Sequence, residues 1–169
     1  MSQAGRRTLL AAMYAMAAVM VLSTVLDTAP RILPMHWGSR EWRFGALGLA
    51  LSSLVTPVLG LGLAMAAGFI GRSSRAIRAL SWLALAVAVV FAVALVAFVV
   101  DYAGMLPTVE APLKLTFRVA TFKAVIMSLL AIPATAALGL GGLRSLRGVA
   151  GVGDTQSEHR GNLVVGQPS

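Results

Sequence analysis

The chain has 169 residues, of which 58% are hydrophobic and 12% are charged, and it carries a net charge of +8 with no cysteine. A soluble domain usually has about 25% charged residues, so this composition excludes a chain dominated by a soluble domain and indicates a multi-pass membrane protein. The lack of cysteine excludes disulfides, thiolate nucleophiles and cysteine-ligated metals.

The basic residues form short clusters between long apolar runs, a pattern that orients helices in a bilayer. We therefore expect the lipid bilayer as a partner and no nucleic acid. The apolar runs predict an all-α membrane protein whose transmembrane domain spans 1–147 as an up-down bundle, since about 20 apolar residues cross the hydrocarbon core. The four predicted spans lie at about 8–26, 43–71, 79–100 and 120–143.

The first span follows a short basic segment, as a signal peptide would. Its only candidate cleavage site puts Asp27 where a small residue belongs and Pro30 just after the cut, so we interpret it as an uncleaved helix. A polar connection then runs over 27–43, with Trp37 and Trp42 suited to a membrane–water interface. Ser39 is a plausible N-cap that would begin the second helix near Arg40.

The second helix contains Pro57 near its middle, and we expect a kink there because proline lacks an amide hydrogen and crowds the preceding turn. Gly60, Ala64 and Gly68 are spaced four residues apart, so they form a stripe that lets another helix approach closely. This stripe is predicted to be a helix-packing interface.

The short basic segment 72–79 predicts an antiparallel hairpin between the second and third spans. The third span repeats the small-residue stripe at Ala84, Ala88 and Ala92. Pro133 predicts a kink in the fourth span. Segment 148–169 is polar and glycine-rich without periodicity, which predicts a disordered cytoplasmic tail.

Orientation follows from the count of Lys and Arg on the two predicted sides. The side with both termini and segment 72–79 collects eight, and the opposite side collects six. The excess favours an orientation with both termini in the cytoplasm.

One cluster in the first outer connection resembles a site. His36 could act as a general base oriented by Glu41 or Asp27, but a histidine between prolines and a tryptophan is also an ordinary interfacial residue. Zinc normally needs three or four ligands, which this segment does not supply, so we expect no metal, no cofactor and no catalytic residue. The candidate outer-loop residues are Asp27, His36, Trp37, Arg40, Glu41 and Trp42.

Residues 22–70 also carry a family-like pattern: a span ending in Leu26-Asp27, a proline-containing connection, then Trp42-Arg43 and the run 56–60, Thr-Pro-Val-Leu-Gly. This pattern resembles the HpsJ-like small membrane proteins of cyanobacteria, which are associated with hormogonium polysaccharide secretion and exosortase-type systems. Segment 101–117 is shorter than the polar insert that members of this family tend to carry. The resemblance implies a setting in envelope assembly and no particular reaction.

These features favour a non-enzymatic membrane accessory or scaffold protein, with a role in polysaccharide export or envelope assembly. It would associate with a membrane-protein partner, or with copies of itself, through the Gly60 stripe or the Trp37–Trp42 connection. The first alternative is a small transporter or channel-like subunit that uses the two kinked helices. However, the predicted span cores contain no ionisable residue, which transporters usually have. The second alternative is a membrane enzyme that acts on a lipid-linked substrate.

Overall fold

The computed structural model describes the backbone of residues 3–161 and the side chains of residues 3–146. These residues form helices and turns, with no strand. The helices are α1 (Gln3–Ile32), α2 (Arg40–Ser52), α3 (Val55–Gly71), α4 (Ser74–Met105), a short 3₁₀ helix η1 (Ala111–Leu113) and α5 (Lys114–Gly161).

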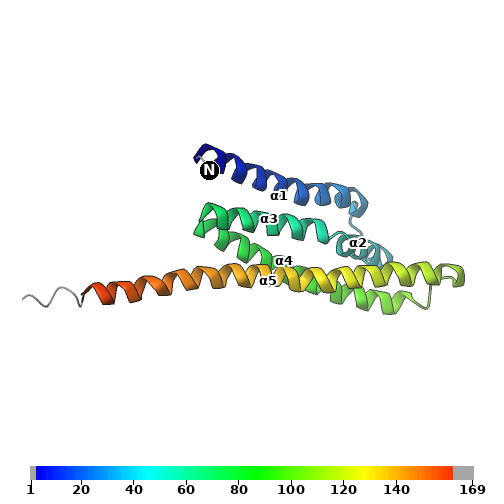
Figure 1. Ribbon diagram of the computed structural model, residues 1–169. Coiled ribbons are helices and arrows are strands. Elements are labelled where there is room, and N and C mark those ends of the chain that lie inside the picture. The colour runs from blue at the N-terminus through cyan, green and yellow to red at the C-terminus, as the bar shows by residue number, and fades with distance from the viewer. Residues whose placement is uncertain (1–2, 162–169) are drawn as a thin grey trace, which may run out of the picture.

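The long helices lie side by side, with α1 against one side of α3 and with α4 and α5 on the other (Figure 1). Among the described residues, three segments are long and apolar enough to cross a membrane: α1, α4 and residues 111–146. A fourth crossing is present if α2 and α3 together form one bent span. These segments indicate a membrane protein.

The first connection is shorter than the sequence predicted. Helix α1 continues past Asp27 to Ile32, so only residues 33–39 separate it from α2. Pro30 lies in the last turn of α1, where the amide of Leu33 still donates to the carbonyl oxygen of Ala29 at 3.0 Å. The predicted cap is confirmed: the hydroxyl of Ser39 accepts a hydrogen bond from the amide of Trp42 at 3.2 Å, and α2 begins at Arg40.

The bend predicted from Pro57 lies at Ser53 and Leu54, where α2 ends and α3 begins at an angle of 43°. The offset has a physical cause, because a proline cannot donate to the carbonyl four residues earlier and its ring clashes with that carbonyl, here Ser53. The hydroxyl of Ser53 donates to the carbonyl oxygen of Ala50 at 3.0 Å and so satisfies a carbonyl at the break. Helix α5, in contrast, is continuous through Pro133.

The small-residue stripe of α3 packs against other helices of the same chain. Gly60, Ala64 and Gly68 are all buried. A Cβ atom on Gly60 would lie 3.0 Å from the carbonyl oxygen of Ala17 and 3.1 Å from the Cβ of Met20, both on α1. The face that could have received a second protein is therefore covered by α1.

Helices α3 and α4 form a hairpin whose turn is only Arg72 and Ser73. Arg72 adopts the left-handed conformation (φ 52°), which ends α3, and the hydroxyl of Ser73 accepts a hydrogen bond from the amide of Ala76 to begin α4. On α4, Ala84 and Ala88 are buried and Ala92 is half-buried.

Helix α5 presents a seam of small side chains with spacings of three and four residues, which is the spacing of helices packed at a shallow angle. Its hydroxyls donate within their own helix: Thr121 to Phe117, Ser128 to Ala124 and Thr135 to Ala131. These bonds let polar side chains lie buried among apolar neighbours. The buried residues of the seam are Thr121, Ala124, Ser128, Ala131, Thr135, Gly139 and Gly142.

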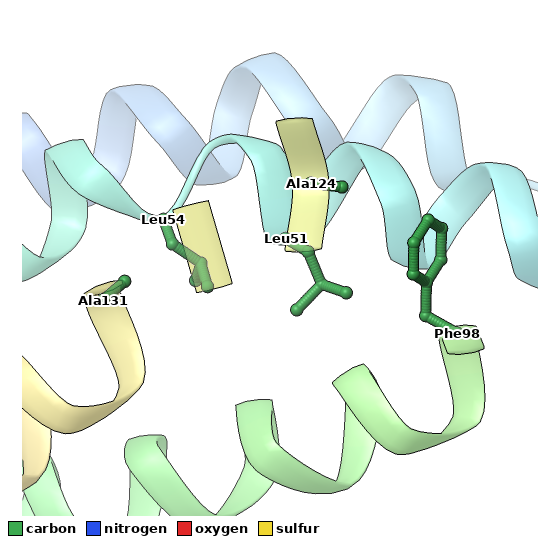
Figure 2. Packing of buried hydrophobic residues seen from close by; sticks show 5 residues of the cluster. All are labelled: Leu51, Leu54, Phe98, Ala124 and Ala131. Carbon is green, nitrogen blue, oxygen red and sulfur yellow. The ribbon is translucent and has the colours of Figure 1, made fainter. Parts of the chain in front are cut away.

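The main apolar core lies beside the bend, where Leu51 and Leu54 are almost fully buried on either side of the break (Figure 2). Phe98 rises from α4 into the same cluster, and Ala124 and Ala131 join it from α5. The bend thus turns two leucines inward from α2 and the turn after it.

The backbone of α5 is helical as far as Gly161, beyond residue 148, where the sequence predicted a disordered tail. The side chains from residue 147 and the whole of 162–169 lie outside the described residues. The nature of the tail stays a prediction.

Candidate functional site

The end of the molecule that carries the 33–39 connection contains an ion pair between α2 and α4. The guanidinium of Arg43 donates to both carboxylate oxygens of Asp101, from Nε to Oδ2 at 3.1 Å and from Nη2 to Oδ1 at 3.0 Å. Its third nitrogen, Nη1, donates to the carbonyl oxygen of Trp37 at 2.9 Å. Such a two-point pair fixes orientation as well as distance.

The side chain of Asp101 is 9% exposed, whereas that of Arg43 keeps 35% of its surface accessible. The Arg40 side chain lies across α4, because a Cβ atom on Gly104 would come within 2.8 Å of its Nη1, and its positive charge also acts on Asp101. The buried carboxylate is therefore held by one arginine and faced by a second.

An aromatic cluster adjoins the ion pair and joins three helices. Phe44 of α2 stacks on Phe98 of α4 with ring centroids 4.6 Å apart, and on Phe117 of α5 at 4.8 Å. Tyr102 completes the cluster by stacking on Phe117 at 5.5 Å. Offset stacking of this kind adds to the apolar burial of each ring.

The two predicted interfacial tryptophans meet at this end. Trp37 and Trp42 contact edge to face with ring centroids 5.2 Å apart. The indole Nε1 of Trp42 donates to the carbonyl oxygen of Ile32 at 3.1 Å, which satisfies one of the free carbonyls at the end of α1. The 33–39 connection is thus fastened at both of its ends.

The remaining candidates do not form a catalytic arrangement. His36 is exposed and its Nδ1 donates to the carbonyl oxygen of Pro34 at 2.9 Å, two residues earlier in its own turn. Asp27 and Glu41 are exposed on α1 and α2, and neither orients the imidazole. Among the described residues, no group of three or more His, Cys, Asp or Glu side chains could hold a metal ion.

Sequence reasoning placed Arg40 and Trp42 at this end but missed the residues that organise it. Asp101, the partner of Arg43, was not among the candidate residues. The available signal was their spacing on α4. Asp101 and Tyr102 follow Phe98 by three and four residues, so the three side chains share one face of the helix. The ion pair and the aromatic cluster hold α2, α4 and α5 together.

Comparison with protein-family models, with curated proteins and with solved structures found no match to this chain.

Proposed function

We propose that the protein is a four-helix integral membrane protein, an up-down bundle that acts as a non-enzymatic accessory or scaffold. In this proposal α2 and α3 together cross the bilayer once, as a bent span. Helices α2 and α3 are together long and apolar enough to cross a membrane, which supports that topology. The small-residue contacts between α1 and α3 support a compact bundle.

The observation that carries the non-enzymatic assignment is that both carboxylate oxygens of Asp101 are bonded to Arg43 in a buried position. All three nitrogens of Arg43 donate within the chain, two to Asp101 and one to Trp37. A carboxylate kept for substrate would have a free oxygen open to a recess, whereas Asp101 is buried and both of its oxygens accept from Arg43. Here the pair instead joins two helices to the adjacent connection, which is a structural role.

The partner surface that we favour is the 33–39 connection. The Gly60 stripe is already covered by α1, so it offers no surface to a second protein. In the connection, by contrast, Leu33 (57%), Met35 (55%) and Trp37 (63%) expose large apolar side chains. Exposed apolar residues held in a fixed turn beyond the helix ends are suited to docking at a membrane–water interface.

The resemblance of residues 22–70 to HpsJ-like proteins supports an envelope setting, with polysaccharide export as the process served. In that setting the protein lies in the bacterial inner membrane with both termini in the cytoplasm. The 33–39 connection would then face outward, toward the export machinery.

In-cell photocrosslinking tests the scaffold role. A photoreactive residue at Met35 should give a discrete protein adduct, whereas one at Val93, exposed on α4 at 65%, should give lipid adducts only. Trp37→Ala should weaken the adduct formed at position 35, and Trp37→Ala and Met35→Ser should each reduce secreted polysaccharide at unchanged protein level. Equal crosslinking at both positions, or unchanged export with both substitutions, would overturn the scaffold role.

A small transporter is the second candidate, favoured by the 43° break between α2 and α3. Broken helices line substrate sites in many transporters. At this break, however, Leu51 and Leu54 fill the space with apolar side chains. Solute flux in liposomes that contain the purified protein alone would favour this candidate over the scaffold.

A further inference from the structure

The charges of the described side chains are divided between the two ends of the molecule. The acidic residues of 3–146 are Asp27, Glu41, Asp101 and Glu110, all at the end with the 33–39 connection and η1. The opposite end has arginines and no acidic side chain among residues 3–146. These arginines are Arg6, Arg7, Arg72, Arg75, Arg78 and Arg144.

Within the described side chains, none of these arginines has an acidic partner, since Arg43–Asp101 is the ion pair present. Arg6 donates to the carbonyl oxygen of Ile70 and so caps the end of α3. Arg72 and Arg78 instead line a recess of about 510 Å³ together with Ser145 of α5. A recess with two arginines and no carboxylate is suited to an anion.

An apolar groove of about 980 Å³ runs between α3 and α5 and meets this recess at Phe69, which lines both. Half of its lining residues are glycine or alanine, such as Gly62 and Ala66 on α3 and Ala137 and Gly141 on α5. The two helices run in the same direction, so the groove follows them lengthwise (Figure 1).

The groove has the length of one lipid leaflet. Its α3 wall extends from Val58 to Phe69, eleven residue steps or about 16 Å at 1.5 Å per residue. Half of a hydrocarbon core of about 30 Å is about 15 Å. The groove therefore begins beside the Pro57 bend, at mid-membrane depth, and ends at Arg72 and Arg78, at headgroup depth.

We propose that this groove and recess form a specific site for an anionic phospholipid, with an acyl chain between α3 and α5 and the phosphate on Arg72 and Arg78. The charge of the recess and the length of the groove both favour this occupant. A protein helix would match the apolar groove but would leave the two arginines unpaired. The site is independent of the scaffold role, which concerns the opposite end.

Native mass spectrometry of the detergent-purified protein tests the site, with phosphatidylglycerol and phosphatidylcholine of identical acyl chains as probes. The wild-type protein should retain one phosphatidylglycerol in preference to phosphatidylcholine. Arg72→Gly should weaken that binding about fivefold, as should Arg78→Gln, because each arginine near an anionic headgroup contributes a factor of this size. Arg72→Gly is chosen because glycine favours the left-handed backbone at this position and keeps the turn intact.

Arg7→Gln is the matched control, because it removes one charge from the same end without altering the recess. For the groove, Gly141→Leu fills open space and should lower the binding of both lipids. Gly45→Leu also enters open space, but at the other end, and should change nothing. Size-exclusion profiles that match wild type verify that each variant is folded.

The proposal is overturned if wild type retains both lipids equally, or if Arg72→Gly and Arg78→Gln bind phosphatidylglycerol as wild type does. It is also overturned if Gly141→Leu leaves lipid binding unchanged while breaking a dimer. In that case the groove holds a second copy of the chain.

Discussion

Ala17 and Gly60 approach so closely that the backbone of α1 lies in van der Waals contact with that of α3. A Cβ atom on Gly60 would lie 3.0 Å from the Ala17 carbonyl oxygen, closer than ordinary side-chain contacts. Since that neighbour is backbone, it cannot move aside as a flexible side chain would. The attachment of α1 to the bundle depends on this position lacking a side chain.

Gly60→Ala is therefore expected to destabilise the fold by about 1–3 kcal/mol, the usual cost of overpacking. Gly62→Ala is the control, because a Cβ there meets only Leu138 at an ordinary 3.8 Å. That change should stabilise by about 0.5–1 kcal/mol through helix propensity. Unfolding in mixed micelles, followed by circular dichroism, measures both, and equal effects would contradict the contact.

The Arg43–Asp101 pair should respond unequally to removal of its two members. Arg43→Leu leaves a buried carboxylate, with a side chain only 9% exposed, without its partner, whereas Asp101→Leu leaves an arginine that still reaches water. Arg43→Leu should be the more destabilising, and the double variant should be more stable than Arg43→Leu alone. Thermal melts of the three variants check this order. If the double variant is the least stable, the loss of the ion pair does not explain the lower stability of Arg43→Leu.

Pro57→Ala should lengthen the distance between the ends of the α2–α3 segment, because the amide of residue 57 could then donate to Ser53 and the 43° bend would relax. Straightening would also move Leu51 and Leu54 out of the core, so stability should fall despite the better helix former. Spin labels at Gly45 and Ala66 report the distance by pulsed electron resonance. An unchanged distance would mean that packing alone sets the bend.

Ser81 should tolerate the loss of its hydroxyl. This hydroxyl is buried beside Gly142 and has no hydrogen-bond partner. An unsatisfied buried hydroxyl costs about 1–3 kcal/mol, so Ser81→Ala is expected to be neutral or stabilising. Ser128→Ala is the comparison, since its hydroxyl donates to Ala124 at 2.7 Å and its loss should stabilise less. A clear loss of stability in Ser81→Ala would reveal a missing partner.

Single cysteines can report the topology, because the chain has none of its own. With four spans, Gln3→Cys and Ser74→Cys should be labelled by a membrane-impermeant maleimide only after the membrane is opened. Gly38→Cys and Glu110→Cys should be labelled in intact spheroplasts. If α2 and α3 do not cross, Gly38→Cys and Ser74→Cys will react from the same side.

The sequence predicted the elements well wherever local chemistry decides them. The Ser39 cap and the break caused by Pro57 follow from one side chain acting on its own backbone. The position of the break needed one more step, because proline acts on the carbonyl four residues earlier. Helix α1 extends beyond its predicted end because it continues through Pro30, although proline cannot donate to the carbonyl of Leu26.

Contacts between helices were harder to predict, because an apolar helix offers several faces and hydropathy does not choose among them. The Gly60 stripe was recognised as a packing face, but its neighbour in the same chain, α1, was not. The pairing of Arg43 with Asp101 links residues 58 positions apart and needs the register of α2 against α4. The same is true of Phe44 with Phe98.

The position of α1 has a consequence for biosynthesis. This helix is made first, and its main packing surface within the chain is α3, which is made only after residue 55. Membrane helices insert individually before they associate. Helix α1 must therefore wait in the bilayer, surrounded by lipid, until the α3–α4 hairpin arrives, and its docking is a late step of assembly.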